Sequence, residues 1–330
     1  MTLPLLDPVG LDDLQEPVLE RLGRVELEMR RLIEDDFPLI SEVNQHLLRM
    51  RGKMFRPTLV LLADEATGRP SPRGETLAAV IELIHLATLV HDDAVDHSTL
   101  RRGMPTINAQ FSHQVSVIMG DFLYSRAVVE LVRLGSLDAL AVLARVTNEM
   151  TIGEMRQLLA HDPLEFTEEQ YDLLIRAKTA SLISGACEVG GLGAEPTVRG
   201  ALAAFGEKLG MAFQIVDDLL DYTADARDTG KPSGLDLREH KVTLPLIHAL
   251  PRFSEAERRL VTSLMGNPEP SDEEIAEVVA AVATRGGLEY ARSRAQRLAA
   301  EAQAALLQLP ESATRAPLRA AIGYVLERRR

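Results

Sequence analysis

Aromatic residues and cysteine are scarce in this sequence. None of the 330 residues is Trp, and Phe, Trp and Tyr together make up 4% of the chain. Proteins that bind single-stranded nucleic acid stack bases on aromatic rings, so this composition and the net charge of −13 argue against a nucleic-acid partner. Cys187 is the single cysteine, which excludes a disulfide within the chain and is typical of the reducing cytoplasm. We therefore expect a cytoplasmic protein.

Signals for secretion and for membrane insertion are also missing. The N-terminal sequence "MTLPLLDPVGLDDLQEP" lacks the basic-then-apolar order of a signal peptide, and charged residues interrupt the apolar segments, so we expect no transmembrane span. Alternating β-branched stretches are scarce, whereas apolar residues recur at three- and four-residue steps from residue 11 to residue 308. Loop-forming sequences such as "TGRPSPRG" separate the helical segments. This pattern predicts one all-α domain over residues 1–330.

One spacing of three aspartates occurs twice, each time at the end of an apolar helical segment. The two sequences are "HDDAVDHSTLRRG" and "FQIVDDLLDYT", and their aspartates are Asp92, Asp93 and Asp96, and Asp217, Asp218 and Asp221. Like charges one helical turn apart repel, and a cation would cancel that cost. Carboxylates without His or Cys partners suit Mg²⁺, which normally shares its coordination shell with substrate phosphates. A solvated helix end would explain one cluster but not the repetition, so we predict a site for several Mg²⁺ ions and a phosphorylated substrate.

Basic side chains accompany both clusters, although only five of the 36 basic residues are lysines. Arg can hold a phosphate through two parallel hydrogen bonds, and Lys supplies a mobile point charge. Ordinary surface charge is the alternative for any one of them. The candidates are Lys53, Arg56, Arg101, Arg102, Lys178, Lys231 and Lys241. His85 lies two turns before Asp92, Thr179 follows Lys178, and Gln214 precedes the second cluster by one turn, where it is placed to orient a carboxylate or a substrate.

At these residues the chain resembles a known family. The motifs "GKMFRP", "LIHLATLVHDDAVDHSTLRRG", "MGDFLYSRA", "KTASL", "FQIVDDLLDY" and "KVTLPL" occur in the order found in trans-isoprenyl diphosphate synthases (polyprenyl synthetases). The resemblance runs from about residue 40 to the C-terminus, its motifs fall within about 40–250, and it is strongest with long-chain members that make quinone side chains. It implies an all-α, single-domain helical bundle around a deep central apolar cavity. It also implies a homodimer that contacts a membrane transiently when the product is released.

The resemblance assigns a role to each candidate residue. Asp92, Asp96 and Asp217 would bind Mg²⁺, and Asp93, Asp218 and Asp221 would complete the catalytic motifs with Arg101 and Lys178. The allylic diphosphate would bind Arg101, Lys178, Lys231 and Lys241, and isopentenyl diphosphate would bind Lys53, Arg56, His85 and Arg102. Thr179 and Gln214 would also bind substrate. Met54 replaces an Arg of the usual first motif, which predicts weaker affinity for isopentenyl diphosphate but retained activity.

The implied reaction is head-to-tail condensation of isopentenyl diphosphate with an allylic prenyl diphosphate. Short-chain members carry a bulky aromatic residue four or five positions before the first aspartate, where this chain has Thr88 and Ala87, with Ile84 and Ile81 further along the helix. These residues predict a product longer than farnesyl, and octaprenyl is our single best prediction. A geranylgeranyl-length synthase stays open as an alternative.

Other classes fit the residues less well. A terpene cyclase or a head-to-head condensing enzyme on the same bundle has no need of a second diphosphate pocket at Lys53, Arg56 and Arg102. A non-catalytic partner subunit would be expected to lose aspartates, and all six are present. An acidic helical scaffold or metal-binding protein would not explain the basic residues beside the acids.

Overall fold

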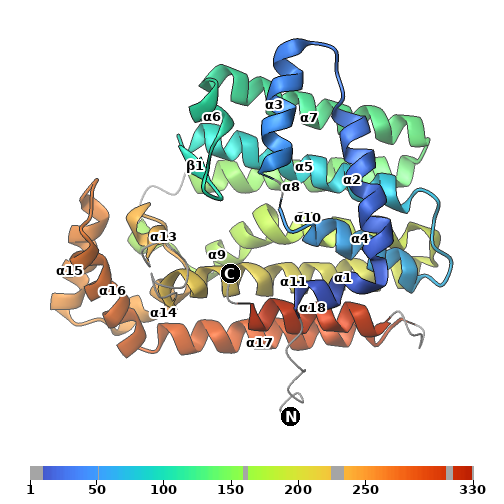
Figure 1. Ribbon diagram of the computed structural model, residues 1–330. Coiled ribbons are helices and arrows are strands. Elements are labelled where there is room, and N and C mark those ends of the chain that lie inside the picture. The colour runs from blue at the N-terminus through green and yellow to red at the C-terminus, as the bar shows by residue number, and fades with distance from the viewer. Residues whose placement is uncertain (1–9, 51, 159–162, 224–233, 310–314, 329–330) are drawn as a thin grey trace.

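The structure is a computed structural model that describes residues 10–50, 52–158, 163–223, 234–309 and 315–328. These residues form a layered bundle of helices, with one short antiparallel hairpin in which Leu100 pairs with Pro105 and Arg101 with Met104 (Figure 1). The hairpin strands are β1 Leu100–Arg101 and β2 Met104–Pro105. The all-α prediction is confirmed.

The N-terminal half supplies one side of the bundle. Its helices are α1 Leu11–Gln15, α2 Leu19–Ile33, α3 Pro38–Arg49, α4 Phe55–Ala66, α5 Gly74–Val95, α6 Ile107–Gln110, α7 His113–Leu134 and α8 Leu137–Leu158. Helices α2 and α3 cross the front of the bundle, whereas α5, α7 and α8 run along its length (Figure 1). Helix α5 therefore carries the first aspartate cluster to the end of the bundle where β1 lies (Figure 1).

The C-terminal half completes the bundle and carries a projecting helical hairpin of α15 and α16 (Figure 1). Its helices are α9 Glu168–Ile175, η3 Arg176–Ala180, α10 Ser181–Gly190, α11 Pro196–Thr223, α13 Leu235–Arg238, α14 Leu244–Ala249, α15 Glu255–Gly266, α16 Asp272–Thr284, α17 Gly287–Leu306 and α18 Arg315–Glu327. Short 3₁₀ turns lie at Glu16–Val18, Pro163–Glu165, Gly191–Gly193 and Leu250–Arg252. Helix α11, with the second aspartate cluster at its end, packs along α17 and α10.

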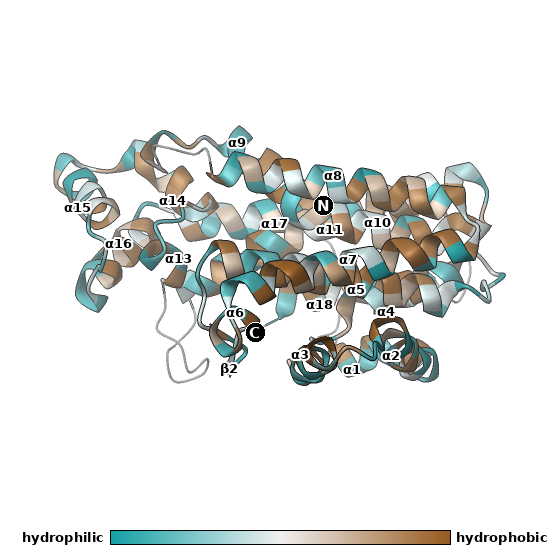
Figure 2. Cartoon of the chain, turned by 90° about the horizontal axis from the view of Figure 1, so that it is seen from above, coloured by the Kyte–Doolittle hydropathy of each residue, from teal (hydrophilic) through white to brown (hydrophobic). Residues whose placement is uncertain are grey.

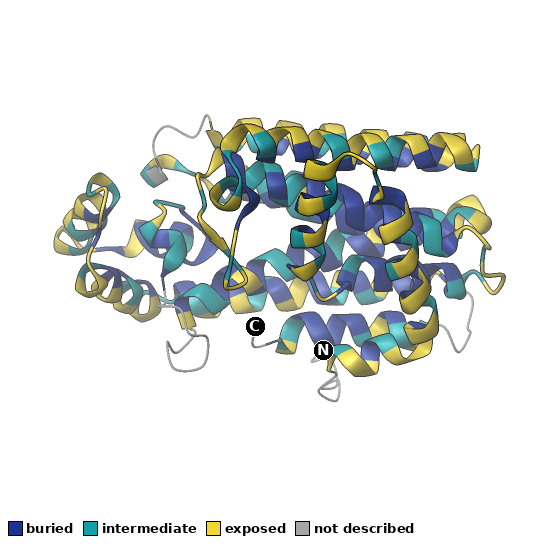
Figure 3. Ribbon diagram, turned by 45° about the horizontal axis from the view of Figure 1, so that its top comes forward, coloured by how far each residue is buried: buried dark blue, intermediate teal, exposed yellow. Residues whose placement is uncertain are grey.

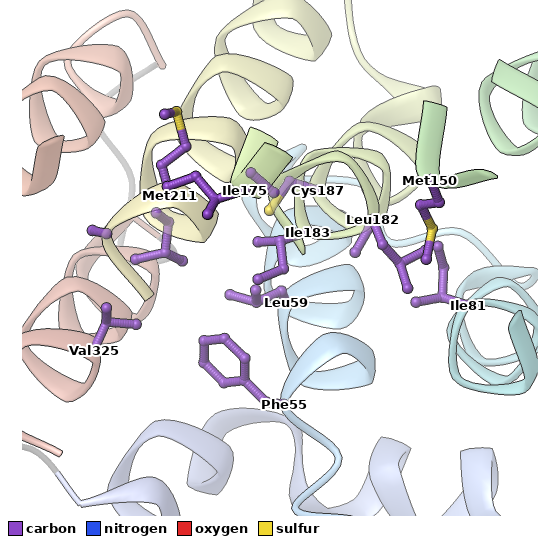
Figure 4. Close-up of a cluster of buried hydrophobic side chains, with 14 of the residues drawn as sticks. Phe55, Leu59, Ile81, Met150, Ile175, Leu182, Ile183, Cys187, Met211 and Val325 are labelled. Atoms are coloured by element: carbon purple, nitrogen blue, oxygen red, sulfur yellow. The ribbon is translucent and has the colours of Figure 1, made fainter. Parts of the chain in front are cut away.

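The buried apolar residues form one continuous cluster that extends from Leu14 to Val325. Figure 4 shows part of it, where Phe55 and Leu59 of α4 lie near Ile183 of α10. Buried residues concentrate inside the bundle and exposed ones on its outer faces (Figure 3). Burial of this apolar surface is the main favourable term in folding.

Helix α5 is the most apolar long helix of the bundle, and Figure 2 shows apolar residues along it and its neighbours. Within the described part of the chain it is the one helix long and apolar enough to cross a membrane. However, 67% of its most apolar window is buried inside the protein. Its composition is therefore accounted for by its place in the core, where α4, α7 and α10 pack against it.

Two glycines let the helices that carry the site approach closely. A Cβ atom on Gly210 of α11 would lie 2.6 Å from Cα of Ala180, and one on Gly153 of α8 would lie 3.2 Å from the backbone nitrogen of Lys178. Both glycines face the turn Arg176–Ala180, which is a π-helix inserted between α9 and α10. Such turns are frequent at functional sites, and this one holds Lys178 and Thr179 between α8 and α11.

Candidate active site

The three aspartates of the first cluster have different surroundings at the end of α5. Asp93 is buried and accepts three hydrogen bonds from Arg101, with Nε–Oδ distances of 3.0 and 2.9 Å and an Nη2–Oδ1 distance of 2.8 Å. Asp92 is only partly buried, and Asp96, the C-cap of the helix, is exposed. The outer two carboxylates are therefore accessible at the mouth of the bundle, while the middle one anchors an arginine.

The hairpin after α5 sends its two arginines in different directions. Arg101 turns back to Asp93, and Arg102 donates from Nη1 to the carbonyl oxygen of Met50 at 2.7 Å. A Cβ atom on Gly52 would lie 2.8 Å from Nη2 of Arg102, so this guanidinium packs directly on the backbone before α4. Arg102 itself has a φ of 52° in a turn with Gly103, whose φ is 76°. The turn thus directs the two arginines toward different parts of the protein, and their predicted roles in binding two substrates stay a prediction.

A second basic group of side chains, called here the Arg56 pocket, lies between α4 and α5 and consists of Arg56, His85 and Arg102. Nη1 of Arg56 is 3.0 Å from Nε2 of His85. Burial, followed by the charges of Arg56, Arg102 and Arg101, lowers the pKa of His85, so the neutral ring accepts this hydrogen bond. Burial raises the pKa of Glu82, which is 3% exposed, and the charges of Arg56 and Arg102 oppose that shift. Glu82 is therefore the counter-ion of this pocket.

Lys53 and Met54 lie just before α4, close to Arg56 in the sequence. The side chain of Lys53 is exposed, and its carbonyl oxygen accepts a hydrogen bond of 2.8 Å from Nε2 of Gln15. Met54 has a φ of 55° and is 7% exposed, with its side chain in the hydrophobic core. The residue that replaces the Arg of the usual motif is thus a core residue in this chain. Its effect on substrate affinity stays a prediction.

Lys178 joins three helical segments at the mouth of the bundle. Its Nζ lies 2.6 Å from Oε1 of Glu154, 3.1 Å from Oε1 of Gln157 and 3.8 Å from Oδ2 of Asp92. Burial raises the pKa of Asp92 to about 6; Lys178 opposes this shift, and Glu154 and Asp96 add to it. Sequence reasoning missed Glu154 and Gln157, although an acid and an amide one turn apart at the end of a helix are a weak signal for such a contact.

Asp218 is the buried member of the second cluster and is held by neutral donors. The hydroxyl of Tyr171 donates to its Oδ2 at 2.5 Å, and Nε2 of Gln214 donates to its Oδ1 at 2.8 Å. Gln214 in turn accepts from Thr179 Oγ1 at 2.8 Å. Burial raises the pKa of Asp218 to about 7. The two hydrogen bonds lower this pKa, and the charges of Asp217 and Asp221 raise it further. Gln214 orients a carboxylate, which was one of its two expected roles.

Asp221 orders the segment that brings Lys241 to the site. Its Oδ1 and Oδ2 accept hydrogen bonds of 3.0 Å from the backbone nitrogens of Leu235 and Asp236 at the start of α13. Burial and the charges of Asp218 and Asp221 raise the pKa of Asp236 to about 8, whereas the charge of Lys241 lowers it. Asp236 is thus a further carboxylate beside the second cluster, and sequence reasoning missed it because it lies outside the repeated spacing.

Lys241 is influenced by Asp96 of the first cluster and by Asp236 beside the second. Its Nζ is 2.6 Å from Oε2 of Glu239. Burial lowers the pKa of Lys241, but Glu239, followed by the charges of Asp236 and Asp96, raises it overall. Asp96 belongs to the first cluster and Asp236 adjoins the second. A charge from the first cluster and a charge from beside the second therefore both act on this lysine.

Asp217 is the most accessible aspartate of the second cluster, with 56% of its side chain exposed. Its Oδ1 accepts a hydrogen bond of 2.6 Å from Nη2 of Arg328, just after α18. The guanidinium of Arg328 lies 3.6 Å from the centre of the Phe213 ring and also donates to the carbonyl oxygen of Phe213. Sequence reasoning missed Arg328, because nothing in the sequence places it beside α11.

The remaining predicted residues are located as follows. Ile84 and Ala87 of α5 are buried, and Thr88 is partly buried, with its hydroxyl donating to the carbonyl oxygen of His85 at 2.8 Å. Lys231 lies outside the described residues. Within the described ranges no group of three or more His, Cys, Asp or Glu side chains forms a ready-made metal cage. Accessible carboxylates at Asp92, Asp96 and Asp217 instead suit Mg²⁺, which completes its shell with water and phosphate.

Comparison with known proteins agrees with this geometry. A profile of the polyprenyl synthetase family matches residues 37–282. The octaprenyl diphosphate synthase of Escherichia coli (strain K12) is 37% identical over 314 residues, which cover 94% of this chain and 96% of that protein. The all-trans-nonaprenyl-diphosphate synthase (geranyl-diphosphate specific) of Rhodobacter capsulatus is 39% identical over 308 residues, which cover 93% of this chain and 94% of that protein.

A solved structure shares the whole fold. It is a polyprenyl synthase from Caulobacter crescentus CB15 complexed with calcium and isoprenyl diphosphate. The two chains are 33% identical, and the match has a TM-score of 0.92 and covers 98% of this chain and 100% of that one. The likeness therefore extends beyond the motif-bearing segments to every layer of the bundle.

Proposed function

Because the chain belongs to the polyprenyl synthetase family, we propose that it condenses isopentenyl diphosphate head-to-tail with an allylic prenyl diphosphate. It is a trans-prenyltransferase whose product is a long-chain, all-trans polyprenyl diphosphate. One observation carries this conclusion: Lys178 lies 3.8 Å from Asp92 of the first cluster, and Lys241 is influenced by Asp96 of that cluster and by Asp236 beside the second. Such an arrangement suits the binding of a diphosphate together with divalent metal.

Asp92, Asp96 and Asp217 are the residues that would hold Mg²⁺. When bound, Mg²⁺ would act as a Lewis acid that stabilises the charge on the leaving diphosphate. The calcium in the Caulobacter crescentus structure supports a divalent metal of this kind. Lys178, Lys241 and Lys231 would hold the allylic diphosphate through point charges, with Arg101 kept beside them by Asp93.

The Arg56 pocket, together with Lys53, would hold isopentenyl diphosphate. Nε of Arg56 is buried, and no acceptor bonds it within the part of the chain that the structure describes. A buried donor of this kind suits an anionic substrate. This second pocket favours a condensing enzyme over a terpene cyclase, which uses one diphosphate.

The chain's own residues then have three tasks in the reaction. They bind both diphosphates, orient the double bond of isopentenyl diphosphate toward the allylic carbon, and exclude water. The allylic C–O bond breaks, a C–C bond forms, and the proton lost from the condensed product goes to the released diphosphate. The apolar residues that precede Asp92 on α5, including Ile84 and Ala87, would protect the allylic cation from water.

The length of the product is proposed to be that of octaprenyl. Thr88 and Ala87 are smaller than the aromatic residues that short-chain members carry at these positions, which favours a longer product. The Escherichia coli relative is named for an octaprenyl product and the Rhodobacter capsulatus relative for a nonaprenyl product. Both names support a chain longer than geranylgeranyl.

The working protein is proposed to be a cytoplasmic homodimer that contacts a membrane only to release product. Helices α7 and α8 support the dimer, because their outer faces carry exposed apolar residues that a second copy would cover. Tyr124 of α7 lies 3.4 Å from Thr147 of α8, which brings the two faces together. The exposed residues are Ile118, Val129 and Val132 on α7, and Ile152, Met155 and Leu158 on α8. In sedimentation equilibrium, Ile118→Asp should shift the mass toward that of a monomer; a wild-type monomer would contradict the proposal.

One assay tests the reaction. The protein is incubated with labelled isopentenyl diphosphate, Mg²⁺ and farnesyl or geranylgeranyl diphosphate, and the labelled chains are sized. Incorporation into products near eight isoprene units is expected. No incorporation from any allylic primer would contradict the activity, and a farnesyl or geranylgeranyl end product would contradict the proposed length.

A further inference from the structure

Helix α8 contributes two residues that control where the ammonium group of Lys178 lies. Lys178 belongs to the π-helical turn η3, and α8 approaches the backbone of this turn closely at Gly153. Glu154, the residue after Gly153, forms an ion pair with Lys178, with Oε1 2.6 Å from Nζ. Oε1 of Gln157 accepts a hydrogen bond of 3.1 Å from the same Nζ. The close approach and the two acceptors together fix the direction of the lysine side chain.

The same ammonium lies near a third acceptor that has another task. Oδ2 of Asp92 is 3.8 Å from Nζ, more than 1 Å further than Glu154. An ammonium at hydrogen-bond distance from Asp92 would compete with a divalent ion for that carboxylate, since both are held by the same oxygens. By pairing with Lys178, Glu154 therefore reduces the pairing of Lys178 with Asp92.

We propose that Glu154 is a positioning residue that holds the ammonium of Lys178 away from Asp92. Asp92 then keeps its carboxylate available for the divalent metal, and Lys178 stays beside the metal site, where it meets the diphosphate. The inference rests on the proposed function, because it assumes that Asp92 binds metal. It deepens that function by giving α8 a part in assembling the site.

Glu154→Gln tests the inference. The variant keeps the shape of the side chain but removes the charge that competes for Lys178, so the ammonium shifts to Asp92. The readout is binding of an unreactive, sulfur-linked analogue of farnesyl diphosphate, measured by isothermal titration calorimetry over a series of Mg²⁺ concentrations. The Mg²⁺ concentration for half-maximal binding should rise roughly fivefold, as expected for one partly exposed ion pair. In the activity assay, saturating Mg²⁺ should restore kcat to near the wild-type value.

A matched control lies on the same helix. Glu149 of α8 pairs with Arg145 at 3.5 Å on the exposed face, away from Lys178. Glu149→Gln removes the same charge from the same helix and should leave the Mg²⁺ dependence unchanged. Glu154→Asp keeps the charge and should recover part of the affinity that Glu154→Gln loses.

A double-variant cycle separates positioning from direct metal contact. If Glu154 acts through Lys178, Glu154→Gln should have little further effect in a Lys178→Gln background. A full fivefold loss in that background would mean that Glu154 contacts the metal shell itself, and would overturn the inference. So would an unchanged Mg²⁺ dependence in an active Glu154→Gln enzyme. Wild-type protein that incorporates no isopentenyl diphosphate would instead contradict the proposed function.

Discussion

The hydroxyl of Tyr171 donates to Oδ2 of Asp218 at 2.5 Å, and this bond fixes the buried carboxylate of the second aspartate cluster. Tyr171 is on α9 and Asp218 on α11, so the bond also ties together two helices that both pack against the π-helical turn. Asp217 and Asp221 flank the carboxylate that is held in this way. The buried aspartate therefore sets the direction of the end of α11.

Tyr171→Phe should weaken both catalysis and stability. The variant leaves Oδ2 of Asp218 buried without its hydroxyl donor, at a cost of about 1–3 kcal/mol in the free energy of unfolding. A misdirected helix end should also lower kcat, roughly tenfold, because small displacements of positioned groups are costly in catalysis. Urea denaturation and the prenyl incorporation assay measure the two effects. Tyr124→Phe, whose exposed hydroxyl is 3.4 Å from Thr147, should change neither quantity appreciably.

Asp93→Asn should uncouple Arg101 from α5. The substitution removes the charge that receives three hydrogen bonds from Arg101, which should cost about 1.5–3 kcal/mol in the free energy of unfolding. Binding of the allylic analogue should weaken at the same time, because Arg101 loses its fixed position. Asp272 pairs with Arg238 on the surface and is 78% exposed, so Asp272→Asn serves as the control. Equal losses in the two variants would contradict a special role for Asp93.

Metal affinity should fall as the pH drops through 6. Burial raises the pKa of Asp92 to about 6, so the carboxylate is ionised above that pH and protonated below it. A metal must displace the proton from the protonated form, so the apparent Mg²⁺ affinity should fall about tenfold per pH unit below 6 and change little between pH 7 and 8. Calorimetric titrations from pH 5 to pH 8 measure this, after correction for proton binding by the analogue alone. An affinity independent of pH from 5 to 7 would contradict the assignment of Asp92.

Thr88→Phe should shorten the product. A phenyl ring four residues before Asp92 would occupy the space beside α5 that the growing chain is proposed to enter. Sizing of labelled products should show chains several isoprene units shorter, with the rate of the first condensation nearly unchanged. Leu89→Phe places the same ring about 100° around the helix and is the control. Unchanged product length in Thr88→Phe would place the limit to chain growth on another helix.

The helical pattern was enough to predict the fold class, and the repeated aspartates were enough to nominate the candidate site. Periodicity reports which face of a helix is apolar, and two identical acid spacings are improbable in a core. The division of labour within each cluster was not predictable. It depends on Arg101, eight residues beyond Asp93, and on Tyr171, 47 residues before Asp218, and only the folded chain brings these partners together.

Single polar residues of the site were also missed for a physical reason. Glu82, Glu154 and Asp236 belong to no repeated motif, and an isolated acid on a helix is usually solvated. Their roles follow from burial and from cationic neighbours supplied by other segments. The π-helical turn at Lys178 could not be predicted either, because a shift of one residue in helical phase leaves the apolar pattern of the segment 168–190 almost unchanged.

The contact between Arg328 and Asp217 has a practical consequence for anyone who produces this protein. Because the side chain of Arg328 is only 6% exposed and its guanidinium lies against Phe213, the end of α18 packs against the second aspartate cluster. An affinity tag fused directly after Arg330 would begin three residues after Arg328. We expect such a fusion to strain the contact between Arg328 and Asp217, and so to alter kinetic constants measured on it. An N-terminal tag, or a cleavable one, is the sound choice.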